Sequence, residues 1–247
     1  MIVPVFNRYE RKYLVTKNTR DALIERFKEH LVFDDYSQNG SSYTIYNIYY
    51  DTVDHNVIRN SVSRPKYKDK LRMRSYKCPI QESDMVFLEI KKKFKKRVNK
   101  RRLILTYKEA IDYVNHGIKP PLSGYQDQQI FKEIDYFIAL NQAKPGAYIQ
   151  YDRIAMLSLH TNFRITFDFN LVFRSTDVGF HSQKGSSIMR DKDLCVMEIK
   201  SEDNFPLWLA HILSETQLYS QSFSKYGKAY ENYLKGGNND DFILSDD

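Results

Sequence analysis

Residues 70–76 read Lys-Leu-Arg-Met-Arg-Ser-Tyr, and residues 86–93 read Val-Phe-Leu-Glu-Ile-Lys-Lys-Lys. Apolar and charged residues alternate in both stretches, so Arg72 and Arg74 fall on one face and the apolar residues beside them on the other. Alternation with a period of two is typical of a β-strand whose two faces meet different surroundings. Both stretches therefore predict strands with one apolar and one charged face.

The same alternation recurs along the chain and predicts eight strands in all. They are Arg8–Val15, Tyr43–Tyr50, Lys70–Tyr76, Val86–Lys93, Lys100–Leu105, Ala147–Ala155, Phe163–Phe169 and Leu194–Lys200. Helical spacing and capping residues predict five helices between or after the strands. The first is capped by Thr16 or Asn18, and the second runs from a Thr106/Glu109 capping box to Gly117. The third covers Gln126–Leu140, the fourth starts near Pro206, and a short fifth lies near the C-terminus. We expect an α+β fold, an eight-stranded antiparallel β-barrel with flanking helices, as one domain over residues 1–235 with a frayed tail over 236–247.

Composition narrows the class of protein. Hydrophobic residues make up 42% of the 247, which argues against disorder, and 38 Lys and Arg against 31 Asp and Glu give a net charge of +7. Such an excess attracts polyanions, although it also serves solubility. With only Cys78 and Cys195, no signal peptide and no run of about 20 apolar residues, we expect a soluble cytoplasmic protein without a disulfide framework or a membrane segment.

The charged faces of the predicted strands carry twelve cations and four anions. If these faces point to the inside of a barrel, the repulsion between their positive charges is costly unless an anion fills the interior. A chain of phosphates would be such an anion. The alternative is an apolar interior with the charged faces in water, which is the ordinary antiparallel arrangement.

The chain also has a strongly basic segment, and it lacks several common catalytic and metal-binding motifs. Residues 91–102 hold nine cations in twelve positions, which alone would suggest a nucleic-acid-binding patch. Because this segment lies between two predicted strands, we expect a β-hairpin. Its turn, with Lys95, Lys96 and Arg97, lies either at the mouth of a tunnel or in a solvated loop. No Walker A loop, zinc motif or nucleophile elbow is present, and no nucleic-acid partner is expected.

Nine short motifs, in order along nearly the whole chain, resemble the VTC domain of polyphosphate polymerases, a family of the CYTH or triphosphate tunnel metalloenzyme superfamily. They are Arg8-Tyr-Glu10-Arg-Lys12-Tyr13, Tyr49-Tyr50-Asp51, Lys70-Leu-Arg72-Met-Arg74, Leu88-Glu89-Ile90-Lys91, Lys100-Arg101-Arg102, Tyr151-Asp152-Arg153, Arg164-Ile-Thr166-Phe-Asp168, Glu198-Ile199-Lys200 and Phe223-Ser224-Lys225-Tyr226.

The resemblance implies a tunnel that holds a triphosphate or a growing polyphosphate with basic side chains and one divalent ion, Mn²⁺ or Mg²⁺. It implies phosphate contacts and catalytic roles for Lys12, Arg72, Arg74, Lys91, Arg153, Arg164 and Lys225, a phosphate contact for Lys100, and metal binding by Glu198. The alternative for Glu198 is an ion pair with Lys200 or Arg164. Arg8, Glu10, Glu89, Arg102 and Lys200 match the pattern as further candidates, of which Arg8, Arg102 and Lys200 are expected to bind phosphate.

One departure from the superfamily pattern bears on the reaction. Hydrolytic CYTH enzymes begin with Glu-x-Glu-x-Lys, whereas this chain has Arg8 at the first acidic position. Loss of that acid weakens a second metal site and the activation of water, while the arginine adds a phosphate contact. We therefore expect a polyphosphate polymerase that uses a nucleoside triphosphate, ATP first among them; the alternatives are a triphosphatase and a non-catalytic polyphosphate-binding domain.

Overall fold

All eight alternating stretches form strands in the computed structural model, which describes residues 9–94, 97–122, 124–202 and 204–235. The strands are β1 (Tyr9–Thr16), β3 (Tyr43–Asp51), β4 (Tyr67–Ser75), β5 (Met85–Phe94), β6 (Arg97–Thr106), β7 (Lys144–Leu157), β8 (Arg164–Arg174) and β10 (Leu194–Ser201). Two strands of two residues each, β2 (Val32–Phe33) and β9 (Ser186–Ser187), were not predicted because two residues are too few to show alternation.

The strands are hydrogen-bonded in the order β1-β10-β8-β7-β3-β4-β5-β6, with β2 added on β7 and β9 on β8. The pairs with a defined register are antiparallel, and β5 and β6 form the predicted basic hairpin. The α+β antiparallel fold is thus confirmed. Since β1 and β6 are the two ends of the described path, the sheet is open rather than a fully closed barrel.

The helices begin and end where the sequence signals them. In α1 (Lys17–Phe27) the Thr16 side chain accepts a hydrogen bond from the Thr19 backbone N–H. In α3 (Tyr107–His116) the Thr106/Glu109 capping box is formed, and Gly117 ends the helix with a φ of 70°. The others are α2 (Asn56–Val62), which was not predicted, α4 (Tyr125–Asn141), α5 (Leu207–Glu215) and α6 (Lys225–Ala229), which a π-helical turn follows over Tyr230–Leu234.

The chain forms two compact units, each built from three segments. Residues 1–44, 151–171 and 189–224 make the first unit, and residues 45–150, 172–188 and 225–247 make the second. Strands β7 and β8 begin in one unit and end in the other.

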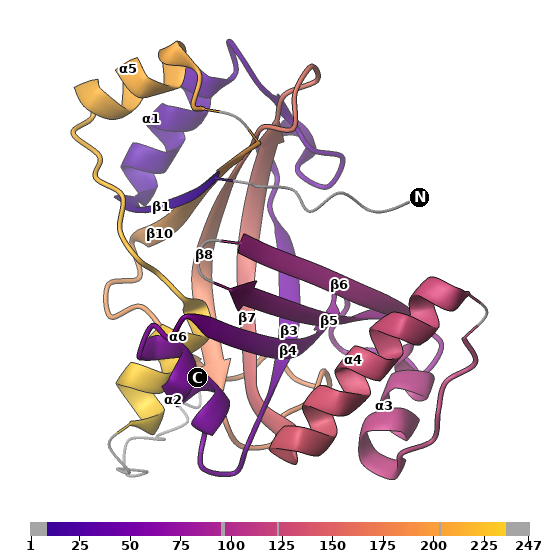
Figure 1. Cartoon of the computed structure of the whole chain (residues 1–247). Coiled ribbons are helices and arrows are strands. Elements are labelled where there is room, and N and C mark those ends of the chain that lie inside the picture. Colours follow the sequence, from indigo (N-terminus) through magenta and orange to yellow (C-terminus); the bar gives the residue numbers. More distant parts are fainter. Residues whose placement is uncertain (1–8, 95–96, 123, 203, 236–247) are drawn as a thin grey trace. The chain divides into compact units, whose positions relative to one another are not determined.

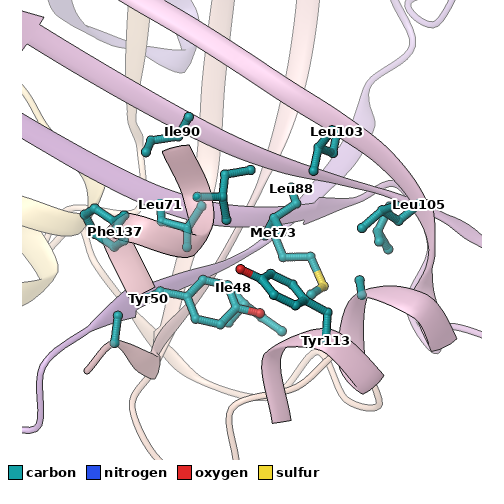
Figure 2. Packing of buried hydrophobic residues seen from close by; sticks show 14 of the residues in the cluster. Ile48, Tyr50, Leu71, Met73, Leu88, Ile90, Leu103, Leu105, Tyr113 and Phe137 are labelled. Carbon is teal, nitrogen blue, oxygen red and sulfur yellow. The ribbon is translucent and has the colours of Figure 1, made fainter. Parts of the chain in front are cut away.

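In the second unit, helices α3 and α4 lie against one face of the β4–β5–β6 strands (Figure 1). The apolar residues of the alternating pattern turn toward these helices and are buried there, as Figure 2 shows for Leu71, Met73, Leu88 and Leu103 around Tyr113. The charged residues that alternate with them, among them Arg72, Arg74 and Glu89, consequently point to the opposite face.

The first unit repeats this arrangement with different elements. Helices α1 and α5 pack together through Phe27 and Trp208, whose ring centroids are 5.8 Å apart. They cover the apolar side chains of β1, β8 and β10, among them Phe167 and Met197. The charged residues of these strands again have the other parity.

Candidate phosphate-binding site

A buried carboxylate organises the charged face of the second unit. Glu89, on β5, is only 2% exposed and lies opposite Arg72 of β4 and Arg102 of β6 in the register. Its Oε2 is 2.7 Å from Arg72 Nε and 3.9 Å from Arg74 Nε, and its Oε1 is 2.5 Å from Lys100 Nζ. Three cations thus share one carboxylate.

Strand β3 holds the two guanidinium groups from the other side. Arg72 Nη1 donates to the Tyr49 hydroxyl at 3.3 Å, and Arg74 Nε donates to Asn47 Oδ1 at 3.2 Å. Asn47 is itself fixed, because its Nδ2 donates to the backbone carbonyl of Ile149 at 3.1 Å. Neutral groups of β3 therefore orient both arginines without adding negative charge to that of Glu89.

The charges of this cluster are out of balance. Burial alone would raise the pKa of Glu89, yet Arg72, Arg74 and Lys100 hold the pKa of that carboxyl well below its usual range. Burial, together with the positive charges of Arg72 and Arg74, lowers the pKa of Lys100 to about 7, although Glu89 opposes this. Three cations around one carboxylate leave the cluster with net positive charge, which an anion would relieve.

Further cations follow along the same strand faces. Lys91 lies opposite Lys70 of β4 and Lys100 of β6 in the register. Arg102 places its guanidinium carbon 5.1 Å from the centroid of the Phe87 ring. The three strands β4, β5 and β6 thus carry a continuous basic surface.

The first unit has a second cluster, in which carboxylates are more numerous. Lys12 Nζ, on β1, lies 3.2 Å from Glu10 Oε1 and 3.9 Å from Glu198 Oε2, and it donates to the Phe223 carbonyl at 3.0 Å. Glu198 Oε1, on β10, is 2.5 Å from Lys200 Nζ. Glu198 and Lys12 are paired in the register of the two strands.

Arginines of β7 and β8 complete the charged side of this unit. Arg153 binds Asp168 through two parallel hydrogen bonds of 2.6 and 2.8 Å, and Asp168 is fully buried. Arg164 Nη2 donates to Asp34 Oδ2 at 2.7 Å, so an acid just after β2 that the sequence did not single out contacts a predicted phosphate ligand.

The electrostatic balance here differs from that in the second unit, because the cluster contains as many carboxylates as cations. Burial lowers the pKa of Lys12, but Glu198, Glu10 and Asp168 outweigh it and raise the pKa. Burial likewise opposes the charge of Arg153, yet Asp168 raises the pKa of that guanidinium well above its ordinary value. The carboxylates, which form the acidic part of this face, therefore balance the cations of the first unit, whereas the charged face of the second unit has an excess of positive charge.

The acidic part suits a hard divalent cation. Glu10 and Glu198 lie on adjacent strands and share the Lys12 ammonium group, and Thr166, opposite Glu198, has a buried hydroxyl oxygen without a hydrogen-bond partner among the described residues. Within that part of the chain no three His, Cys, Asp or Glu side chains are grouped to enclose a metal. Mg²⁺ and Mn²⁺ do not require such a cage, because they keep several waters and bind one or two carboxylates together with phosphates.

Lys225 is the first residue of α6, and a buried network fixes the helix at that point. Asp51, at the end of β3, accepts hydrogen bonds from the Val57 and Ile58 backbone and, at 2.8 Å, from the Tyr226 hydroxyl. The Tyr226 ring packs on Tyr49 with centroids 5.0 Å apart. Two residues of the Tyr49-Tyr50-Asp51 motif, for which the sequence suggested no role, thus connect α6 to the arginine cluster.

Burial decides between the two readings of the charged faces. The side chains of Arg74 and Arg153 are each only 11% exposed, which is incompatible with a fully solvated charged face. The repulsion expected along these faces is reduced by Glu89, Glu198, Asp168 and Asp34, each of which contacts at least one predicted site cation.

Some predictions about the site stay open. Arg8, Lys95 and Lys96 and the tail over 236–247 lie outside the described residues, and so does the side chain of Arg97. Lys12, Glu198, Lys200, Arg153 and Arg164 lie in the first unit. Arg72, Arg74, Lys91, Lys100, Arg102 and Lys225 lie in the second. Their roles as phosphate and metal ligands remain predictions.

Comparison with known proteins agrees with the fold. The family model described as the VTC domain matches residues 7–234. No curated protein sequence matches significantly. Among solved structures, a Bacillus halodurans protein described as a "putative adenylate cyclase" is 16% identical, with a TM-score of 0.54 over 88% of this chain and 95% of its own. A Vibrio parahaemolyticus protein of the same description is 14% identical, with a TM-score of 0.45 over 90% and 97%.

The described residues contain no helix that is long and apolar enough to cross a bilayer.

Proposed function

The chain belongs to the VTC domain family, and from this membership and the charges of its sheet we propose that it is a polyphosphate polymerase. It transfers the γ-phosphoryl group of a nucleoside triphosphate, ATP first among them, to a growing chain of inorganic polyphosphate. The cytoplasm is the proposed location.

One observation carries the proposal: Arg72, Arg74 and Lys100 share the single carboxylate of Glu89, and the pKa of Lys100 is lowered to about 7. A phosphoryl group brings the negative charge that this cluster lacks, and it accepts several charge-assisted hydrogen bonds at once. Arg72 and Arg74 are alternate residues of one strand, about 7 Å apart along it, so their planar guanidinium groups are suited to two phosphoryl groups of one phosphate chain.

The reaction needs no side-chain nucleophile. A terminal oxygen of the polyphosphate chain attacks the γ-phosphorus, a new P–O bond forms, and the bond to the β–γ bridging oxygen breaks to release the nucleoside diphosphate. The basic side chains bind and align both phosphate chains and neutralise the charge that spreads over the transferred group. Lys12, Arg153, Arg164, Lys91 and Lys225 are proposed to take part in this alignment.

Glu198, with Glu10 beside it, would hold the divalent ion, which would supply further charge neutralisation when bound. Lys12 Nζ and Lys200 Nζ lie 3.9 and 2.5 Å from the oxygens of the Glu198 carboxylate. Arg8 at the first acidic position favours a phosphate chain over water as acceptor.

Product analysis tests the proposal. Purified protein is incubated with ATP and Mn²⁺, and the products are separated by length. We expect long polyphosphate chains; orthophosphate alone would indicate a triphosphatase, and binding without turnover a polyphosphate-binding domain.

A matched pair of variants ties the activity to the cluster. Arg72→Ala should lower the rate about 100-fold, because one charge-stabilising donor is lost. Arg101→Ala is the control: Arg101 lies on β6 but contacts Glu133 of helix α4 on the opposite face, so its loss should leave the rate unchanged. Equal rates for the two variants would contradict the assignment.

A further inference from the structure

The charged face of β4, β5 and β6 changes character at one end. Phe87 of β5 lies opposite Arg74 on one side and Ile104 of β6 on the other. Tyr76, just after β4, packs edge-on against the Phe87 ring with centroids 5.9 Å apart. Beyond the Arg72–Glu89–Arg102 row, β5 and β6 therefore present an aromatic and apolar surface, with Arg74 of β4 beside it.

This end is open to solvent although it is apolar. Tyr76 is 45% exposed, Met85 50% and Ile104 55%. An exposed group of large apolar side chains beside polar ones is typical of a binding surface. The helices of this unit cover the other face of the same strands, so the fold itself does not bury these side chains.

Arg102 marks the boundary between the apolar end and the charged rows. Its guanidinium lies over the Phe87 ring, and none of the described carboxylates is within ion-pair distance of it, although Glu89 is its partner in the register. Flat rings and guanidinium planes are the groups on which proteins stack nucleobases. Phosphate chains have no flat apolar part that would use this surface.

We propose that the surface formed by Tyr76, Met85, Phe87 and Ile104, with Arg102 at its edge, binds the nucleobase and ribose of the nucleoside triphosphate. The inference rests on the proposed function, which places the phosphates on the adjacent Arg72, Arg74 and Lys100. Along β5, Phe87 is about 7 Å from Glu89 and about 14 Å from Lys91, a span comparable with an extended nucleoside triphosphate. The site recognises the base by stacking, so it accepts purines in general and prefers them to pyrimidines, whose rings are smaller.

Two ligands, one with and one without a nucleobase, distinguish the contribution of the base to binding from that of the phosphates. Dissociation constants are measured by calorimetry for ATP and for inorganic tripolyphosphate, both in EDTA so that no turnover occurs. For Phe87→Leu, which keeps the apolar volume but removes the ring, ATP should bind about tenfold more weakly and tripolyphosphate unchanged. Phe87→Tyr keeps the aromatic ring and should bind ATP as tightly as the wild type does. Tyr125→Ala, an exposed aromatic residue on α4, is the control and should bind both ligands as the wild type does.

The outcomes are distinct. If Phe87→Leu binds ATP as tightly as the wild type, or loses ATP and tripolyphosphate equally, the base subsite is wrong while the phosphate site stands. If the wild-type protein binds neither ligand, the proposed function fails and the subsite with it. Melting curves show that each variant is folded.

Discussion

Replacing Glu89 by Gln keeps the shape of the side chain but leaves Arg72, Arg74 and Lys100 without their shared carboxylate. Removing one partner of a buried ion pair costs about 3–5 kcal/mol. We expect the low end, about 3 kcal/mol, because Arg72 and Lys100 are partly exposed to water. Each kcal/mol moves the melting midpoint of a chain this long by roughly 2–4 °C, so the midpoint should fall by roughly 6–12 °C.

Tripolyphosphate should reverse most of this loss. A ligand at about 100 times its dissociation constant adds about 2.7 kcal/mol to the stability of the folded state, or roughly 5–11 °C here. Because the phosphates take the place of the missing negative charge, Glu89→Gln should bind tripolyphosphate more tightly than the wild type, and its ligand-induced shift should be larger at equal concentration.

Melting curves with and without tripolyphosphate measure both effects. Glu133→Gln is the control, since Glu133 also joins two cations of β5 and β6, Lys92 and Arg101, but on the face that α4 covers. Its partly exposed pairs are worth about 1 kcal/mol or less, and its ligand shift should equal that of the wild type. A Glu89→Gln variant with wild-type stability, or with a smaller ligand shift than the wild type, would refute the reasoning.

Three further predictions follow from other contacts. Glu198→Gln should abolish turnover but retain tripolyphosphate binding, because the basic side chains remain. The pKa of Lys100 is lowered from 10.5 to about 7, so between these pH values the unfolded chain binds more protons than the folded one, and the unliganded protein gains stability as the pH rises. Tripolyphosphate favours the charged amine of Lys100, so its binding should tighten by up to about tenfold per pH unit as the pH falls from about 9 to 7. Lys100→Met should abolish this pH dependence. Asp51→Asn should lower the free energy of unfolding by about 2 kcal/mol, because buried hydrogen bonds to a charged acceptor are weakened, and by loosening Tyr226 it should lower the rate through Lys225.

Each of these predictions has a clear contrary result. Unchanged turnover of Glu198→Gln at saturating Mn²⁺ would make Glu198 an ion-pair partner only. Calorimetric titrations between pH 7 and 9 that give the same affinity throughout would show that Lys100 does not contact the phosphates. Asp51→Asn that melts at a lower temperature but keeps its full rate would limit Asp51 to a structural role.

The strands were predictable because their alternation is driven by burial on one face only. Leu71 and Met73 must pack on helices, so Arg72 and Arg74 must face the other way, and the periodicity of two shows this directly. The caps of α1 and α3 were predictable for a similar reason, because Thr16 and the Thr106/Glu109 box act within a single turn.

Other polar contacts were not predictable, because they join residues far apart in the chain. Asp34 follows a two-residue strand and reaches Arg164 130 residues later, and no local pattern announces it. Asp51 and Tyr226 are separated by 175 residues in the same way. The charge balance of the first unit depends on such long-range contacts, since Lys12 and Glu198 are also far apart in the chain.

The fate of the γ-phosphoryl group tests the central claim most directly. The protein is given ATP labelled at the γ-phosphorus together with a short polyphosphate primer and Mn²⁺, and the label is counted in the lengthened chain and in free orthophosphate. We predict that most of the label enters the chain, in the wild type and in Arg101→Ala alike. Label found only in orthophosphate, with the primer unchanged in length, would contradict the account.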